Sequence, residues 1–263
     1  YGLVGSEMCI RDRTETEPDQ FYVFEVNENY WAGTPQVDEL VFVLFADTSG
    51  QLGGLRTQAV DMIVNPVSPE QISVLENVEG IDVIQGPEFT TSMINYDMER
   101  PPFNNKTVRQ AMNLAIDRQD LIDTVYLGAA SPGSPGWIHP VSPLFNEEVE
   151  SVYDPDLAIE MLEDAGITDS DGDGVRELDG VPLSFEYLTQ SSDALTLRTA
   201  EVTSQMLGEI GIDAQVSAVE DSTWEEAVWP GFDVVNGRNY EMSTWGWSSP
   251  VQAIPVRLSS LLH

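Results

Sequence analysis

The 263-residue chain carries 45 aspartate and glutamate residues but only 11 lysine and arginine residues, for a formal net charge of −34. Nucleic acids and anionic membrane surfaces bind through clusters of lysine and arginine, so this charge excludes both as partners. Cys9 is the only cysteine, which excludes an intramolecular disulfide and a cysteine-based zinc site.

The acidic residues are spread along the chain and are not gathered into one tail. A dispersed acidic surface with a single lysine, Lys106, indicates a halophilic protein, because salt screens the repulsion between carboxylates. An ordinary acidic secreted protein is the alternative interpretation. Hydrophobic residues make up 41% of the chain and no apolar run is long enough to span a bilayer, so we expect a globular body outside the membrane.

The two ends of the sequence do not fit a domain. Residues 1–13 show neither helical nor strand periodicity and lack the apolar core of a signal peptide, so they are predicted to be a non-native, adapter-derived segment. The last residues, 258–263, end without a capping or turn signal. The sequence is therefore interpreted as an internal fragment of a longer gene product.

The first half of the chain alternates between strand and helix patterns. The apolar run at 40–45 (LVFVLF) predicts a buried strand, and Thr48 or Ser49 can cap a helix that extends to about residue 59. Ser68 precedes a proline at the first helical position, which predicts a second helix. Further strands are expected at 61–64, 81–85 and 89–97. Alternation of this kind indicates an α/β layered fold.

Two prolines, Pro101 and Pro102, break this alternation with a stiff, extended connection. Helices with asparagine or aspartate caps are expected after it, beginning at Asn104 or Asn105, Asp117, Asp154 and Asp193. Strands are expected at 183–188, 212–219, 232–235 and 241–247. Residues 129–144 are rich in glycine, proline and serine and are predicted to form a loop.

The order of short motifs along residues 21–247 is that of a known family. The most specific stretch combines 100–104 (RPPFN), 108–111 (VRQA) and 115–118 (AIDR). Other matching stretches are 29–33 (NYWAG) with 37–40 (VDEL), 58–61 (QAVD), 171–175 (DGDGV) with 180–183 (GVPL), 211–213 (GID), 232–233 (FD) and 245–247 (WGW). On these motifs the chain resembles the peptide/nickel-type extracellular solute-binding proteins of family 5.

The resemblance implies an α/β, bilobed periplasmic-binding-protein-like (type II) fold that is incomplete at both ends. Residues 14–97 would form part of lobe I and residues 98–263 most of lobe II. The resemblance also implies the substrate-binding component of an ABC importer, which captures a peptide or similar small solute between its lobes and delivers it to a membrane permease. The expected protein is an extracytoplasmic monomer, in the periplasm or lipid-anchored at the outer face of the cell membrane.

Four residues are candidate ligand contacts under this resemblance. Trp245 and Trp247 lie two positions apart on an expected strand, so both face one side and can form an aromatic wall. Asn95 ends a strand before the crossing between lobes, and Trp137 lies in the glycine- and proline-rich loop. Core packing of the tryptophans and a turn-capping role for Asn95 are the alternatives. Trp247 is followed by serines where many peptide binders of the family hold the α-amino group with an aspartate, which favours a neutral or differently charged solute.

Residues 169–174 (DSDGDG) match the first half of a calcium-binding loop. The candidate metal ligands are Asp169, Asp171, Asp173 and Glu177. Gly180 stands where such a loop needs its last glutamate, so a polar turn that uses aspartate and glycine for its backbone angles is the alternative. Apart from this structural Ca²⁺, no cofactor is expected.

The sequence contains none of the common catalytic motifs, and its only histidines are His139 and His263. A mechanism that needs a histidine beside a serine or cysteine nucleophile therefore has almost no candidate residues, and we predict that the protein is not an enzyme. The alternative is a secreted acidic hydrolase that uses a pair of carboxylates.

Overall fold

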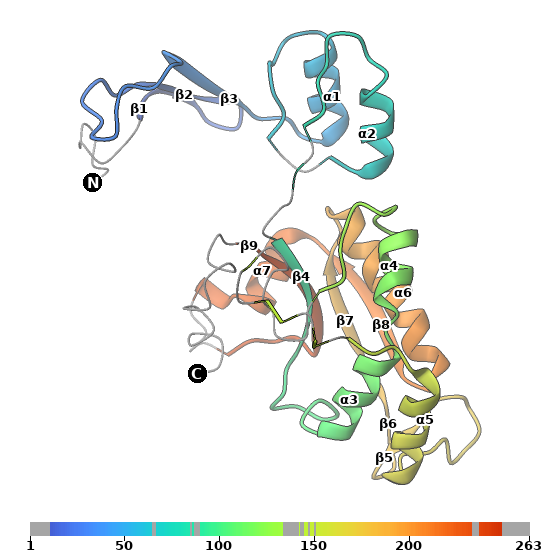
Figure 1. Cartoon of the computed structure of the whole chain (residues 1–263). Coiled ribbons are helices and arrows are strands. Elements are labelled where there is room, and N and C mark those ends of the chain that lie inside the picture. The colour runs from blue at the N-terminus through green and yellow to red at the C-terminus, as the bar shows by residue number, and fades with distance from the viewer. Residues whose placement is uncertain are drawn as a thin grey trace. The chain divides into compact units, whose positions relative to one another are not determined.

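The computed structural model describes residues 11–64, 67–84, 86, 90–133, 142, 145–146, 148–149, 151–232 and 237–248 (Figure 1). The chain divides into two compact units, Tyr1–Val83 and Ile84–His263. None of the helices in the described part of the chain combines the length and the apolar character that a membrane crossing requires.

The first unit contains a three-stranded antiparallel sheet. Its strands are β1 (Arg11–Glu17), β2 (Phe21–Val26) and β3 (Glu39–Val43), with β2 in the centre. Arg11 and Arg13 of β1 pair with Val26 and Phe24 of β2. The segment 1–13, which we expected to lie outside the fold, thus contributes its last three residues to β1, because backbone pairing needs no apolar side-chain pattern.

β3 is an edge strand whose side chains remain exposed. The apolar run predicts a buried strand here, yet Val41, Phe42 and Val43 are 44%, 43% and 42% exposed. Burial requires a second layer packed on the sheet, and the described residues of this unit supply little of it. The prediction of a strand is confirmed, whereas the prediction that it is buried is wrong.

Two helices, α1 (Thr48–Arg56) and α2 (Pro69–Leu75), complete the first unit. Asp47 caps α1, one residue before the predicted cap, because its Oδ1 accepts a hydrogen bond from the Gly50 N–H at 2.7 Å. Pro69 is the first residue of α2, as predicted. Strands were also expected at 61–64 and 81–85. The described residues of these stretches, 61–64 and 81–84, form no strand, since a strand needs a ladder partner as well as a local pattern.

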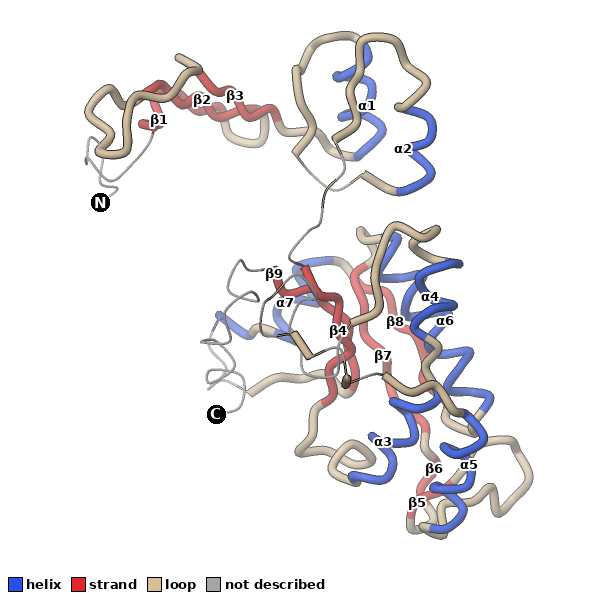
Figure 2. The backbone as a smooth tube through the Cα atoms, viewed as in Figure 1, coloured by secondary structure: helices blue, strands red, loops and turns tan. Residues whose placement is uncertain are grey.

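The second unit is built on a four-stranded sheet in the order β4-β9-β7-β8 (Figure 2). Its strands are β4 (Thr90–Tyr96), β7 (Ser184–Gln190), β8 (Asp213–Val219) and β9 (Met242–Ser248). β7 runs parallel to β8 and β9, and β4 runs antiparallel to β9. A short hairpin of β5 (Glu177–Leu178) and β6 (Val181–Pro182) precedes β7.

The predicted caps start the four helices expected in this unit. These helices are α3 (Lys106–Ala115), α4 (Arg118–Thr124), α5 (Pro155–Asp164) and α6 (Ala194–Glu209). Their caps are Asn105, Asp117, Asp154 and Asp193, and each side chain accepts a backbone N–H of the first turn. Local chemistry alone sets these helix starts.

The stretch after β8 differs from the prediction. It forms the helix α7 (Asp221–Val228), which the sequence analysis missed, and the 3₁₀ turn η1 (Pro230–Phe232). A strand was expected at 232–235, but Phe232 ends the turn, and residues 233–235 lie outside the described residues. The signal available in the sequence was the helical spacing of two apolar residues, Trp224 and Val228, which the structure buries.

Successive residues of the sheet serve two different cores, as expected for strand geometry. Tyr187 of β7 belongs to the larger core, which includes residues of α3, α4, α5 and α6. Its neighbour Leu188 belongs to the smaller core, with Trp224 and Val228 of α7 and with Tyr240. Helices therefore cover both faces of this sheet, and α7 covers the face opposite to α6.

The boundary between the two compact units falls between Val83 and Ile84. The sequence predicts a division at 97/98, which places β4 with the preceding segment. In the structure β4 pairs along its whole length with β9, from Thr90 opposite Ser248 to Tyr96 opposite Met242. This pairing, which joins residues far apart in the chain, puts β4 in the second unit.

Candidate ligand-binding site

The β4–β9 ladder brings together three of the four residues predicted to contact a ligand. Asn95 pairs with Ser243, two positions before Trp245, while Trp247 pairs with Thr91. Residues that pair directly in a ladder share a face of the sheet, so Asn95 lies on the face that carries Trp245. Nothing is described of the Trp247 side chain, and Trp137 lies outside the described residues.

Asn95 already uses its side-chain amide locally. Its Nδ2 donates to the carbonyl oxygen of Met93 at 3.2 Å, within the same strand. Asn95 is partly exposed. This bond lies within β4 and is neither the turn cap named as the alternative nor a ligand contact, so the role of Asn95 stays a prediction.

Trp245 packs into an aromatic cluster formed by Trp224, Trp229, Tyr240 and Trp245. Its ring centroid lies 6.3 Å from that of Trp224, 5.7 Å from that of Trp229 and 5.7 Å from that of Tyr240, in edge-to-face arrangements. Trp224 and Tyr240 are buried, whereas Trp229 and Trp245 are partly exposed. Each edge-to-face pair contributes about 0.5–1.5 kcal/mol beyond its buried area, so the cluster holds the Trp245 indole in one orientation.

A buried serine anchors the cluster to the sheet. The indole N–H of Trp224 donates to Ser243 Oγ at 3.0 Å, and Ser243 Oγ donates to the carbonyl oxygen of Leu188 at 2.9 Å. Ser243 is fully buried. The sequence analysis did not single out Ser243 or Trp224, because neither residue stands in a recognisable motif.

Arg238 adds a positive charge at the edge of the cluster. Its guanidinium carbon lies 4.5 Å from the ring centroid of Trp229, the geometry of a cation–π contact. Burial raises the pKa of the Tyr240 phenol, and the nearby Arg238 guanidinium partly opposes this shift. The cluster therefore presents partly exposed indole rings beside a cation.

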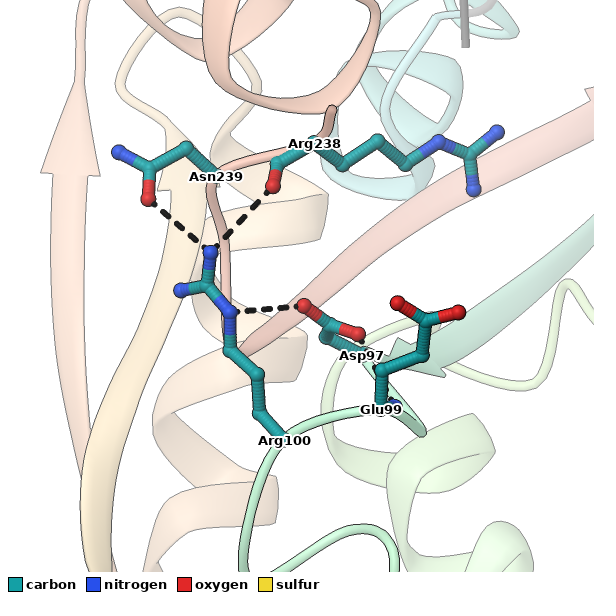
Figure 3. Close-up of polar contacts among 5 residues, drawn as sticks. All are labelled: Asp97, Glu99, Arg100, Arg238 and Asn239. Carbon is teal, nitrogen blue, oxygen red and sulfur yellow. Dashed lines mark hydrogen bonds and ion pairs between the residues drawn. The ribbon is translucent and has the colours of Figure 1, made fainter. Parts of the chain in front are cut away.

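Arg100 connects the end of β4 to the residues that precede β9 (Figure 3). Its Nε forms an ion pair with Asp97 Oδ2 at 2.9 Å. Its Nη2 donates to the carbonyl oxygen of Arg238 and to Asn239 Oδ1, both at 3.4 Å. The Glu99 N–H donates to the other Asp97 oxygen at 3.1 Å, which fixes the carboxylate. In the sequence Arg100 stands out only as part of a motif, because Arg238 and Asn239 lie well over a hundred residues away.

Three of the four predicted metal ligands lie together, two in the loop before β5 and one at the start of β5. Carboxylate oxygens of Asp169, Asp171 and Glu177 lie within 4.8 Å of one another, and Asp173 is not part of this group. Such a set of hard oxygen donors is of the kind that Ca²⁺ uses, although a complete site needs more ligands.

The same carboxylates already organise the loop backbone. Asp169 accepts from the N–H groups of Gly172 at 2.7 Å and Gly174 at 3.0 Å, and Glu177 accepts from the Ser170 N–H at 2.9 Å. Both glycines have positive φ angles, 84° and 96°, which other residues rarely adopt. These contacts are those of the polar turn named as the alternative.

An open hollow of about 460 Å³ lies on the sheet of the first unit. Its lining is mostly apolar and consists of Asp19, Gln20, Phe21, Val23, Val41, Val43 and Leu44. None of these residues was predicted to contact a ligand, and Asp19 and Gln20 are the only polar residues in this lining.

The chain matches a known protein family. The family model described as bacterial extracellular solute-binding proteins, family 5 Middle, matches residues 13–263. The nickel-binding periplasmic protein of Escherichia coli K12 is 28% identical over 218 residues, which cover 80% of this chain and 40% of that protein. The oligopeptide-binding protein AppA of Bacillus subtilis 168 is 26% identical over 242 residues, which cover 89% of this chain and 42% of that protein.

A solved structure shows the same fold. The structure of AppA from Bacillus subtilis in complex with a nonapeptide superimposes with a TM-score of 0.75 at 23% identity, over 94% of this chain and 48% of that one. The α/β periplasmic-binding-protein-like fold expected from the sequence is thereby confirmed. The chain covers less than half of the length of these relatives. It belongs to family 5 of the bacterial extracellular solute-binding proteins.

Proposed function

We propose that this protein is the substrate-binding component of an ABC importer, which captures a peptide or a similar small solute and delivers it to a membrane permease. The family match along residues 13–263 supports this proposal, as do relatives named for binding nickel and oligopeptides. The protein would act outside the cytoplasm, in the periplasm or at the outer face of the membrane with a lipid anchor. It would work as a monomer and without covalent chemistry.

The observation that carries the proposal is the partly exposed Trp245, held by three aromatic neighbours on the sheet. A rigid ring binds the apolar part of a solute with little loss of conformational entropy, which is why such side chains line many ligand sites. Trp247 lies two positions further along the same strand and would extend the aromatic wall.

The charges near the aromatic cluster bear on the class of solute. Residues 248–250 are Ser-Ser-Pro, without the acidic group that would hold a peptide α-amine. The charge beside Trp229 is instead the Arg238 guanidinium. These features favour a neutral or anionic solute over one anchored by a free amine.

A tryptophan fluorescence titration tests the proposal. The probes are a dipeptide, a nonapeptide, an oligosaccharide and NiCl₂, and the probe is recovered afterwards and checked by mass. We expect a saturable change with one probe class at 1:1 stoichiometry and an unaltered ligand. Cleaved product would instead support the acidic hydrolase, and no response to any probe would count against a binding protein.

A matched pair of variants locates the site. Trp245→Phe should weaken binding of the responding probe by about tenfold, which corresponds to about 1.4 kcal/mol. Trp31→Phe is the control, because Trp31 lies in the first unit and is 75% exposed. Equal affinities of the two variants would place the ligand away from the aromatic cluster.

A further inference from the structure

The segment just before β9 carries two contacts of the aromatic cluster. This segment, residues 238–241, is called the pre-β9 segment. Arg238 lies over the Trp229 ring with its guanidinium carbon 4.5 Å from the centroid, and the Tyr240 ring lies 5.7 Å from that of Trp245. The orientation of the partly exposed rings therefore depends on where this segment lies.

Two backbone hydrogen bonds and one to the Glu241 side chain hold the pre-β9 segment on two sides. Towards α7, the Asn239 N–H donates to the Ala227 carbonyl oxygen at 2.8 Å. Towards the sheet, the Asp97 N–H donates to the Glu241 carbonyl oxygen at 2.9 Å, and Glu241 Oε2 accepts from the Glu186 N–H at 2.7 Å. These bonds fix the segment at residues 239 and 241.

Arg100 supplies a side-chain bridge to the same segment. The Asp97 ion pair at its Nε orients the guanidinium, and its Nη2 donates to the Arg238 carbonyl oxygen and to Asn239 Oδ1 (Figure 3). The guanidinium is planar with donors in a rigid fork, so it can contact a carboxylate and two other acceptors at once, whereas a lysine ammonium cannot reproduce this geometry.

We propose that Arg100 is a positioning residue for the aromatic cluster: by holding the pre-β9 segment to the end of β4, it sets the orientation in which Trp229 and Trp245 meet a solute. Arg100 acts through Arg238 and Tyr240 and does not itself contact the ligand. Its importance for binding rests on the proposed function, whereas its effect on the rings does not.

Near-ultraviolet circular dichroism of the full 263-residue chain tests the positioning role without a ligand. The Trp245 contribution is the difference between each spectrum and that of the same chain carrying Trp245→Phe. We expect Arg100→Ala to lose most of this contribution and Arg100→Lys to recover only part of it. The control is Arg198→Ala, which should leave the spectrum unchanged. This variant removes an ion pair of the same spacing on α6, in which Arg198 Nη1 lies 3.1 Å from Glu201 Oε2.

An unchanged Trp245 contribution in Arg100→Ala would overturn the proposal. If Arg100→Ala does not fold, Asn239→Ala removes one acceptor and keeps the Asp97 ion pair, and the same loss of signal is then expected from it. Loss of signal in Arg198→Ala to the same extent would also overturn the proposal, because it would show a general loss of packing.

Affinity for the nonapeptide separates this inference from the proposed function. Where the native chain binds the nonapeptide, Arg100→Ala should weaken binding by about tenfold, and Arg198→Ala should not. A native chain that binds no nonapeptide would count against a peptide-binding function, while the dichroism would still decide the positioning role. An Arg100→Ala chain with altered dichroism and native affinity would overturn the link between ring orientation and binding.

Discussion

At the scale of single residues, Ser243 anchors the aromatic cluster to the sheet through a buried hydrogen bond. Ser243→Ala would leave the buried Trp224 indole N–H without its acceptor, so we expect the free energy of unfolding to fall by about 1–3 kcal/mol. Urea denaturation measures this loss. Ser222→Ala on the exposed side of α7 is the control and should change stability by less than about 0.5 kcal/mol. Equal effects would show that the indole finds another acceptor.

Tyr96 predicts how stability depends on alkaline pH. Burial raises the pKa of its phenol from 10.0 to about 12, while the charges of Arg118 and Arg109 lower it to a smaller extent. The unfolded phenol ionises at lower pH than the folded one, so the contribution of Tyr96 to stability is complete below pH 10 and is lost as the pH rises towards 12.

Tyr96→Phe keeps the ring that stacks on Phe103 but removes the ionisable group. The variant should therefore lose less stability between pH 10 and pH 12 than the native chain does. Urea denaturation at a series of pH values provides the measurement. Parallel pH profiles for the two proteins would contradict a raised pKa at this residue.

At the scale of structural elements, residues 169–177 form either a polar turn alone or a calcium site, and two measurements separate these interpretations. Asp169→Ala removes the acceptor of two backbone N–H groups, so it should destabilise the unit by about 1–2 kcal/mol with or without calcium. Thermal unfolding in CaCl₂ and in EDTA tests the ion. A higher Tm in CaCl₂ than in EDTA that Asp171→Asn abolishes would support bound Ca²⁺. Equal Tm values in the two solutions would support a polar turn without a bound ion.

The starts of four helices in the second unit were predictable from the sequence, whereas the environments of the strands were not. Asn105, Asp117, Asp154 and Asp193 cap their helices as predicted, because a cap acts on backbone N–H groups within the next few residues. The run at 40–45 forms a strand but stays exposed, and α7 was missed. Burial of a strand depends on a second layer of structure, and the residues of that layer are not the sequence neighbours of the strand.

At the scale of the whole molecule, the net charge of −34 predicts a dependence on salt. The screening length falls from about 30 Å at 0.01 M salt to about 3 Å at 1 M, so repulsion between surface carboxylates weakens steeply over this range. We expect the free energy of unfolding to rise as NaCl increases to molar levels, as in a halophilic protein. Urea denaturation at several NaCl concentrations measures it, and a stability that does not depend on NaCl would contradict halophilic adaptation.

The candidate site was only partly predictable. The sequence placed Asn95 on one expected strand and Trp245 and Trp247 on another, and the structure has these strands as β4 and β9. Their pairing in one ladder was not predicted, because it joins segments far apart in the chain. The partners of Trp245 could not be read from the same pattern, because Trp224 lies in α7, which was not predicted, and Trp229 directly follows that helix. Asn95, Trp137, Trp247 and the metal ligands stay predictions for experiment.

The amino-acid sequence by itself determined the charge, the lack of an internal disulfide, the capped helices and the family motifs, because each depends on composition or on residues a few positions apart. Only the tertiary structure decided that β4 joins the second sheet, that Trp245 faces α7, and that Arg100 reaches the segment before β9. Strand register and side-chain partners are set by contacts between segments far apart in the chain, and such contacts leave no periodic signal in the sequence.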